Sequence, residues 1–237
     1  MPYLMGGFPD LETSARIGEA CLDAGGDLLE LGVPYSDPLA DGPVINAAGT
    51  RALRAGATLD GVLGVAERLA ARAPVVLMTY VNLVLARGPD AFARRLADLG
   101  AAGLIVPDLP LEESEEIRVA CDAAGIALVP LVAPTTTEER LAAIGAAARG
   151  FLYTVSVVGT TGERAESSYE EIVSRAKACT EVPVALGFGI GTPEQASQAA
   201  GAGADGVIVG TRLVRAADEG GVEGVREVVA AMAKALH

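Results

Sequence analysis

Eight short apolar runs recur along the chain, and amphipathic segments separate them. The runs span residues 2–5, 27–31, 74–79, 103–107, 126–131, 151–155, 182–186 and 206–210. The segments between them, such as 11–25, 90–100, 111–125, 137–150 and 192–203, have helical periodicity, and several end at glycine. Strands that alternate with helices are typical of a parallel sheet covered on its outer face. Eight such units favour a closed (βα)8 TIM barrel of the α/β class over an open doubly wound sheet, and we expect one such domain over residues 1–237.

Two of the eight units are longer than the rest, and the extra length follows the second and the sixth apolar runs. The two insertions lie at residues 32–49 and 156–171, and both combine glycines with polar residues. In a TIM barrel the loops after the strands form the active face. We therefore expect extended loops there that act as lids over a ligand.

Histidine and lysine are scarce, which restricts the possible chemistry. The one histidine is the last residue, His237, so a histidine base, a catalytic triad and a histidine metal site are excluded as expectations. The two lysines, Lys177 and Lys234, lie in helical patterns away from strand ends, which argues against a Schiff base. The three cysteines are too widely spaced for a zinc site or a disulfide framework. Carboxylates, tyrosines, backbone amides and helix dipoles remain.

The charge balance bears on partners and location. The net charge is −13, which repels nucleic acid and anionic membrane surfaces. The apolar runs are shorter than the roughly 18 residues of a membrane span, and the N-terminus lacks the pattern of a signal peptide. We expect a soluble, cytoplasmic protein with no metal.

Acidic residues at the end of the second apolar run are candidates for acid–base chemistry. Glu30 lies in a run otherwise made of leucines, where burial would raise the pKa of its carboxyl group into a useful range. The alternative is a glutamate on the outer face of the strand or one that reaches solvent. Asp41 and Asp37 follow in the first insertion, and either could face the same site or only form a turn or a helix cap. Spacing alone does not choose between them.

Other polar and aromatic residues follow later strands. Tyr153 is directed either into the site or into the core. Tyr80 and Asn82 follow the third run, and Asp108 follows the fourth, where it could simply cap the next helix.

Glycine-rich turns follow the seventh and eighth runs, at residues 187–192 and 209–212. Loops in these positions, together with a helix N-terminus, commonly bind phosphate in TIM barrels. A dinucleotide fingerprint is weak here because Thr192 occupies the place of its third glycine. The alternative to a phosphate site is that these glycines serve only tight turns.

The blocks LELGVPYSDPLADGPVIN, VPDLPLEES, SVVGTTGER, GFGIGTPEQ and GADGVIVGTRLV together resemble the tryptophan synthase alpha subunit. The resemblance runs almost end to end. It implies a lyase that cleaves indole-3-glycerol phosphate reversibly to indole and glyceraldehyde 3-phosphate, without a cofactor of its own. It also implies a beta-subunit partner in an α2β2 heterotetramer, and pyridoxal phosphate would belong to that partner.

The resemblance assigns roles to individual residues. Glu30 and Asp41 match the catalytic pair, Tyr153, Phe188 and Tyr80 match positions around the substrate, and Gly162, Gly189, Gly210 and Thr211 match the phosphate-binding positions. Pro34, Asp37 and Pro38 match a loop that meets the beta subunit. The other functions considered are a free-standing indole-3-glycerol phosphate lyase and a weakly catalytic barrel that mainly activates its partner.

Departures from the family pattern affect mainly the start of the chain. Family members usually have a helix before the first strand, which is missing here, so we expect that Met1 is not the native start. Met5 and Gly7 stand where other residues are common. The block SVVGTTG differs from the commoner form in the second insertion but keeps its glycines and threonine.

Overall fold

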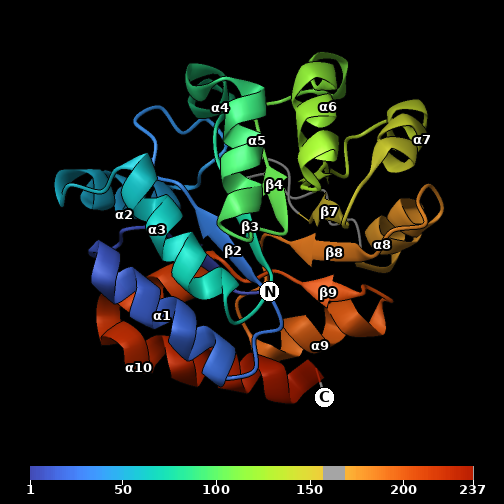
Figure 1. Ribbon diagram of the computed structural model, residues 1–237. Coiled ribbons are helices and arrows are strands. Elements are labelled where there is room, and N and C mark those ends of the chain that lie inside the picture. The colour runs from blue at the N-terminus through green and yellow to red at the C-terminus, as the bar shows by residue number, and fades with distance from the viewer. Residues whose placement is uncertain (157–168, 237) are drawn as a thin grey trace.

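The computed structural model describes residues 1–156 and 169–236, and it confirms the predicted TIM barrel (Figure 1). Its parallel strands are β1 (Tyr3–Met5), β2 (Leu29–Gly32), β3 (Val75–Met78), β4 (Gly103–Ile105), β5 (Ala127–Val129), β6 (Leu131–Val132), β7 (Leu152–Val155), β8 (Val184–Gly187) and β9 (Gly206–Val207). The fifth predicted run forms two of these, β5 and β6, because Pro130 has no N–H to donate to the ladder. The strands form two parallel sheets, ordered β1-β2-β3-β4-β5 and β6-β7-β8-β9. The two sheets meet where the Tyr3 amide donates to the Val209 carbonyl at 2.9 Å and the Val209 amide donates to the Met1 carbonyl at 3.1 Å.

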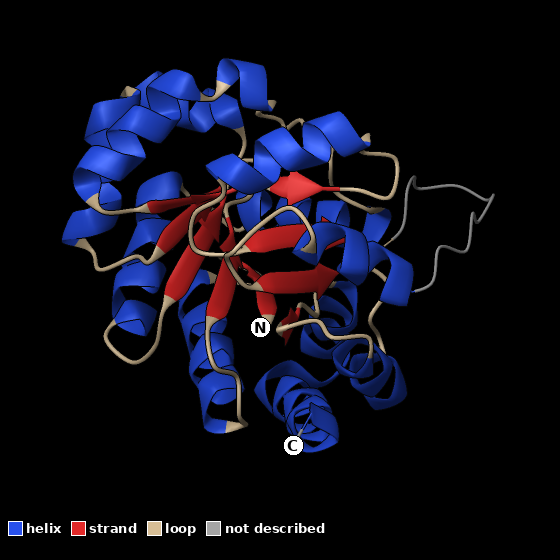
Figure 2. Cartoon of the chain, turned by 90° about the vertical axis from the view of Figure 1, so that its right-hand side faces the viewer, coloured by secondary structure: helices blue, strands red, loops and turns tan. Residues whose placement is uncertain are grey.

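Helices surround the barrel on its outer side (Figures 1 and 2). They are α1 (Leu11–Asp23), α2 (Pro43–Arg54), α3 (Leu59–Ala70), α4 (Val81–Arg87), α5 (Pro89–Asp98), the short 3-10 helix η1 (Leu111–Glu113), α6 (Glu115–Ala124), α7 (Glu138–Ala147), α8 (Tyr169–Lys177), α9 (Pro193–Gly201) and α10 (Thr211–Leu236). The extra length after β2 therefore holds a loop and an additional helix, α2. An additional helix, α4, also follows β3, where the sequence predicted only the helix at residues 90–100. The centre of the insertion after β7 lies outside the described residues.

Alternation along the strands divides the core into two layers. Side chains such as Val76, Ile105 and Ile208 point into the barrel, whereas Leu31 and Leu77 pack outward against the helices. The inner layer fills the barrel, so a ligand can enter only at an end.

The two ends of the barrel differ. At the carboxyl ends of the strands the loops enclose a cavity of about 410 Å³. At the amino ends β1 is the first element, and a hollow of about 600 Å³ is lined by Met1, Phe151, Met232 and other residues. The predicted site residues that the structure describes lie at the carboxyl end.

Candidate active site

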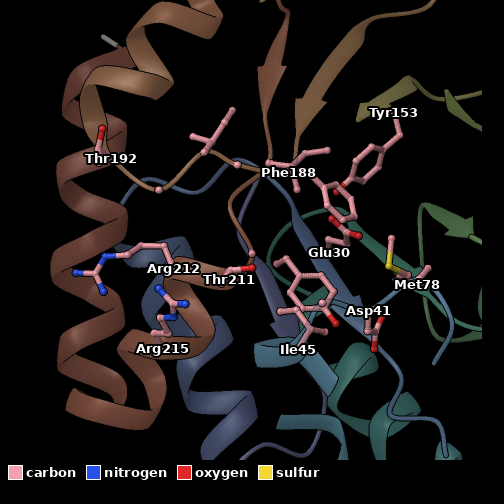
Figure 3. Close-up of a pocket in the computed structure, with 18 residues that line it drawn as sticks. Glu30, Asp41, Ile45, Met78, Tyr153, Phe188, Thr192, Thr211, Arg212 and Arg215 are labelled. Carbon is pink, nitrogen blue, oxygen red and sulfur yellow. The ribbon is translucent and has the colours of Figure 1, made fainter. Parts of the chain in front are cut away.

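The cavity at the carboxyl ends of the strands collects residues from both halves of the chain (Figure 3). Seven residues singled out from the sequence line it: Glu30, Asp41, Tyr153, Phe188, Gly189, Gly210 and Thr211. The wall also includes Arg212, the last residue of the predicted turn 209–212, and five residues that no sequence motif indicated: Tyr3, Ile45, Met78, Ile208 and Arg215. The cavity's volume falls within the range of small-molecule sites, and its apolar wall is interrupted by a few polar groups.

Glu30 lies at the bottom of this cavity with its carboxyl group fully buried. Its neighbours Leu29 and Leu31 point outward, so alternation along β2 turns Glu30 inward, and the alternative of an outer-face glutamate is wrong. Its exposed fraction is 0%, and neither carboxylate oxygen has a hydrogen-bond partner among the described residues. Burial raises the pKa of this carboxyl group to about 8. At neutral pH Glu30 is therefore mainly a neutral acid that can donate a proton.

Asp41 reaches the same cavity from the loop between β2 and α2. The Tyr80 hydroxyl donates a hydrogen bond to Asp41 Oδ1 at 2.9 Å, and the same hydroxyl accepts one from the Ala40 amide at 3.1 Å. Burial raises the pKa of Asp41, and the hydrogen bond from Tyr80 opposes that shift. Tyr80 thus lies behind Asp41 and is absent from the cavity wall, although the resemblance suggested a place near the substrate. Its two hydrogen bonds connect the loop between β2 and α2 to the start of α4.

Asp37, the competing loop acid, lies outside the cavity wall. It is exposed and accepts a hydrogen bond from the Ser36 hydroxyl at 2.5 Å. Pro34 is buried and Pro38 is half-buried in the same loop. Geometry therefore favours Asp41 over Asp37 as the second acid of the site.

Two tyrosines lie beside Glu30 on the inner face of the barrel. Each occupies space that a glycine on the neighbouring strand leaves free. Tyr3, which is 6% exposed, is the register partner of Glu30 on β1. A Cβ added to Gly32 would lie 2.2 Å from the Tyr3 hydroxyl, and one on Gly187 would lie 2.6 Å from Cε1 of Tyr153. Burial raises the pKa of both hydroxyls well above the ordinary value, so both remain neutral donors. The signal for Tyr3 in the sequence was an aromatic residue in the first apolar run.

Phe188 forms the rim of the cavity in an uncommon backbone conformation. Its φ is +65°, and its side chain is 42% exposed. The ring meets that of Tyr153 edge-on at 6.2 Å between centroids, and the Ser156 hydroxyl donates to the Phe188 carbonyl. A positive φ in a bulky residue is strained, and such strain is concentrated at functional sites.

The end of the cavity opposite the carboxyl groups is formed by helix N-termini. At α9 the side chain of Gln195 accepts hydrogen bonds from the amides of Gly191 and Thr192, at 2.8 and 3.1 Å. At α10 the Gly210 carbonyl accepts from the amides of Leu213 and Val214. The amides of Thr211 and Arg212 precede these two and have no partner within the helix by its geometry, and both residues line the cavity.

The glycines at this end of the cavity are required for different reasons. Gly189 has φ +84°, as the tight-turn alternative requires. Gly210 has no positive φ, and a Cβ there would come no closer than 3.6 Å to Tyr3, which is ordinary contact. The turn itself therefore does not demand glycine at 210, whereas close approach of a ligand would. Gly162, the fourth predicted phosphate-binding position, lies outside the described residues.

Asp108 and Asn82 serve the loops around the site. Asp108 Oδ1 accepts a hydrogen bond from the Val81 amide at 2.9 Å, so it caps α4 of the neighbouring unit and not the helix that follows it. Asn82 donates to the Tyr35 hydroxyl at 2.9 Å. Neither residue lines the cavity.

Residues 1–156 and 169–236 contain no group of three or more His, Cys, Asp and Glu side chains that could hold a metal ion. No helix in the same ranges is long and apolar enough to cross a membrane.

Comparison with known proteins gives one consistent result. The family model described as "Tryptophan synthase alpha chain" matches residues 1–236. The tryptophan synthase alpha chain of Synechococcus elongatus is 49% identical over 240 residues, which cover 100% of this chain and 90% of the relative. That of Methanosarcina acetivorans is 45% identical and covers 99% of this chain and 85% of the relative.

Solved structures agree with the sequence relatives. A structure of Mycobacterium tuberculosis tryptophan synthase superimposes with a TM-score of 0.93 and 42% identity, and covers 99% of this chain and 91% of that one. A chain of the tryptophan synthase α2β2 complex of Pyrococcus furiosus superimposes with a TM-score of 0.88 and 33% identity, and covers 98% and 95%. With the cavity and its two acids formed on the same barrel, the chain belongs to the tryptophan synthase alpha chain family.

Proposed function

We propose that the protein cleaves indole-3-glycerol phosphate reversibly to indole and glyceraldehyde 3-phosphate, as the alpha subunit of a tryptophan synthase. The observation that carries this proposal is the neutral, fully buried Glu30 at the bottom of a largely apolar cavity. An aromatic ring fits the apolar wall, and the N-terminus of α10 at the other end suits a phosphate group.

Glu30 is the proton donor and then the proton acceptor of the reaction. Its carboxyl group, whose pKa burial raises to about 8, protonates the indole ring carbon that bears the glycerol chain. The carboxylate then removes the proton from the hydroxyl of the adjacent glycerol carbon while the bond between that carbon and the ring breaks. The electrons of the broken bond restore the aromatic ring, the glycerol carbon becomes an aldehyde, and Glu30 is again protonated.

Asp41 stabilises the cation that exists between these two steps. Protonation of the ring carbon makes the indole nitrogen part of a positively charged indolenine. A carboxylate that accepts a hydrogen bond from that N–H, and is already oriented by Tyr80, lowers the energy of the cation without reorganisation.

The phosphate is held at the opposite end. Gly189, Gly210 and Thr211 line this part of the cavity, and the Thr211 hydroxyl together with the first amides of α10 are its donors. Gly162 is expected to complete this set. The protein uses no cofactor of its own in this mechanism.

A beta subunit is the proposed partner, in an α2β2 assembly, with pyridoxal phosphate bound by that subunit only. The loop with Pro34, Asp37 and Pro38 is the proposed contact, since it presents Leu39 with 89% of its surface exposed beside the cavity. An exposed leucine next to a site entrance suits a surface that another protein covers.

Indole release from indole-3-glycerol phosphate by the isolated chain tests the proposal, and a second assay adds a beta subunit of a relative. We expect slow release alone and a marked increase with the partner. High activity alone with no response to the partner would support the free-standing lyase instead. Activation of the partner without any indole release would support the weakly catalytic barrel.

A further inference from the structure

Two arginines, Arg212 and Arg215, line the cavity from the first turns of α10. In Figure 3 both lie on the same side of the cavity as Thr211, away from Glu30, and the side chain of Arg212 extends away from Thr211. The family resemblance assigned no role to either position. The charged and polar groups around the two arginines indicate what they bind.

Neither guanidinium group is neutralised by a carboxylate in the described part of the chain. Most arginines there form ion pairs, as Arg68 does with Glu12 and Glu19. Asp218, an acid of the same helix, is already paired with Arg51 at 2.5 Å. The two cavity arginines are thus available to an anion that enters the cavity.

The positive charge of Arg212 in the first turn is unfavourable for α10 by itself. The N-terminus of a helix carries partial positive charge and prefers acidic side chains. The first turn of α9 follows this rule with Glu194, whereas the first turn of α10 has no acidic residue and includes Arg212. A bound anion would reverse the sign of this interaction, because it would face the helix dipole and both arginines together.

The neighbouring donors at this end are partly occupied. Gln195 already accepts hydrogen bonds from the amides of Gly191 and Thr192, so these amides are not free for a ligand. The chain as a whole has a net charge of −13, which repels a phosphate dianion at long range. Local positive charge is therefore needed to make an anion stay at this end.

We infer that Arg212 and Arg215 bind the phosphate group of the substrate and select a phosphorylated ligand over an uncharged one. The inference rests on the proposed function and deepens it, because it names the groups that neutralise the dianion. A guanidinium group can donate two parallel hydrogen bonds to phosphate oxygens, which a lone amide cannot. The arginines act in binding and are remote from the bond that breaks.

The test compares Arg212→Gln, Arg215→Gln and the double variant with Arg94→Gln as the matched control. Arg94 is exposed on α5, forms no ion pair in the described ranges and lies outside the cavity, so it removes the same charge elsewhere. We expect KM for indole-3-glycerol phosphate to rise about 10-fold in each single variant and more in the double variant. We expect kcat and the affinity for indole to change less than 2-fold, since charge at the other end is untouched.

Inorganic phosphate provides a readout that does not depend on turnover. It should raise the melting temperature of the wild type and of Arg94→Gln, and this shift should disappear in the double variant. Without phosphate the double variant should melt no lower than the wild type, because the removed charges oppose the helix dipole. An equal phosphate shift and an equal KM in the wild type and the double variant would overturn the inference. Absence of any phosphate shift in the wild type would instead reject the phosphate site of the proposed function.

Discussion

Glu30 and Asp41 face one cavity, but the chain holds their carboxyl groups in different ways. Glu30 is part of a strand, so its position is fixed by the sheet, and its buried carboxyl group has no hydrogen-bond partner in the part of the chain that the structure describes. Asp41 lies in a loop, so its position depends on the hydrogen bond from Tyr80. The strand buries its acid and raises the pKa of Glu30 strongly, whereas the loop orients Asp41 through a hydrogen bond that opposes the rise in pKa caused by burial. The two proposed roles, proton transfer and cation stabilisation, require this difference.

The largest effect is expected from Glu30→Gln. The amide keeps the size of the side chain but can neither donate an acidic proton nor accept one, so indole release should fall about 10⁴-fold. Single-turnover assays with indole-3-glycerol phosphate measure this loss, and a titration with indole checks that binding survives. Turnover within 10-fold of the wild type would rule out Glu30 as the acid–base group.

Asp41→Asn should lower kcat about 10³-fold, because a neutral amide stabilises a cation poorly. The matched control is Asp37→Asn, a change of the same kind four positions earlier in the same loop but outside the cavity. Steady-state kinetics of both variants decide the assignment. If Asp37→Asn is the inactive variant and Asp41→Asn is active, the two loop acids have to be exchanged.

The burial of Glu30 also predicts how stability changes with pH. Its pKa is about 8 in the folded protein against an ordinary value of 4.5, so between these values the folded chain keeps a proton that the unfolded chain has lost. The free energy of unfolding should therefore fall as pH rises through this window, by about 1.4 kcal/mol per pH unit from this group.

Urea unfolding of the wild type and of Glu30→Gln at pH 6 and pH 7 measures this contribution. The variant does not titrate at this position, so the difference in unfolding free energy should move in its favour by about 1.4 kcal/mol between the two pH values. A difference that stays constant would mean that the buried carboxyl group has an ordinary pKa.

The smallest effect is expected from Tyr80→Phe, which removes the hydrogen bond to Asp41 and keeps the ring. Asp41 would then be less well oriented, and kcat/KM should fall about 5-fold, or about 1 kcal/mol. Tyr35→Phe is the control, since its ring stacks on Tyr80 at 5.1 Å between centroids and its hydroxyl contacts only Asn82 among the described residues. Equal losses in both variants would indicate general damage to the loop.

The sequence predicted the parts of the molecule that repeat. The alternation of apolar runs and helices predicted the barrel, and the glutamate between leucines predicted a buried acid. The missing N–H of Pro130 could also have predicted the break in the fifth apolar run, which was expected to form a single strand.

Contacts between distant segments were the parts that local patterns could not supply. The hydrogen bond from the Val81 amide to Asp108 joins residues 27 positions apart, and the one from Tyr80 to Asp41 joins residues 39 positions apart. Such pairs depend on how neighbouring units pack, and no periodicity within one unit encodes them. Tyr3 was missed for the same reason, because only the parallel register places it beside Glu30.

The contact between Tyr3 and Gly32 has a consequence for how this site can change over time. The phenol ring occupies the space in which any other residue at 32 would place its first side-chain carbon. The two positions therefore cannot vary independently: an alanine at 32 is tolerated only after the residue at 3 becomes shorter, and the order of the two steps is fixed. We expect Gly32→Ala to destabilise the wild type and to have little additional effect in a Tyr3→Ala background, which urea unfolding of the two single variants and the double variant measures. This pair therefore limits the mutational routes by which the cavity could come to accept a different ring.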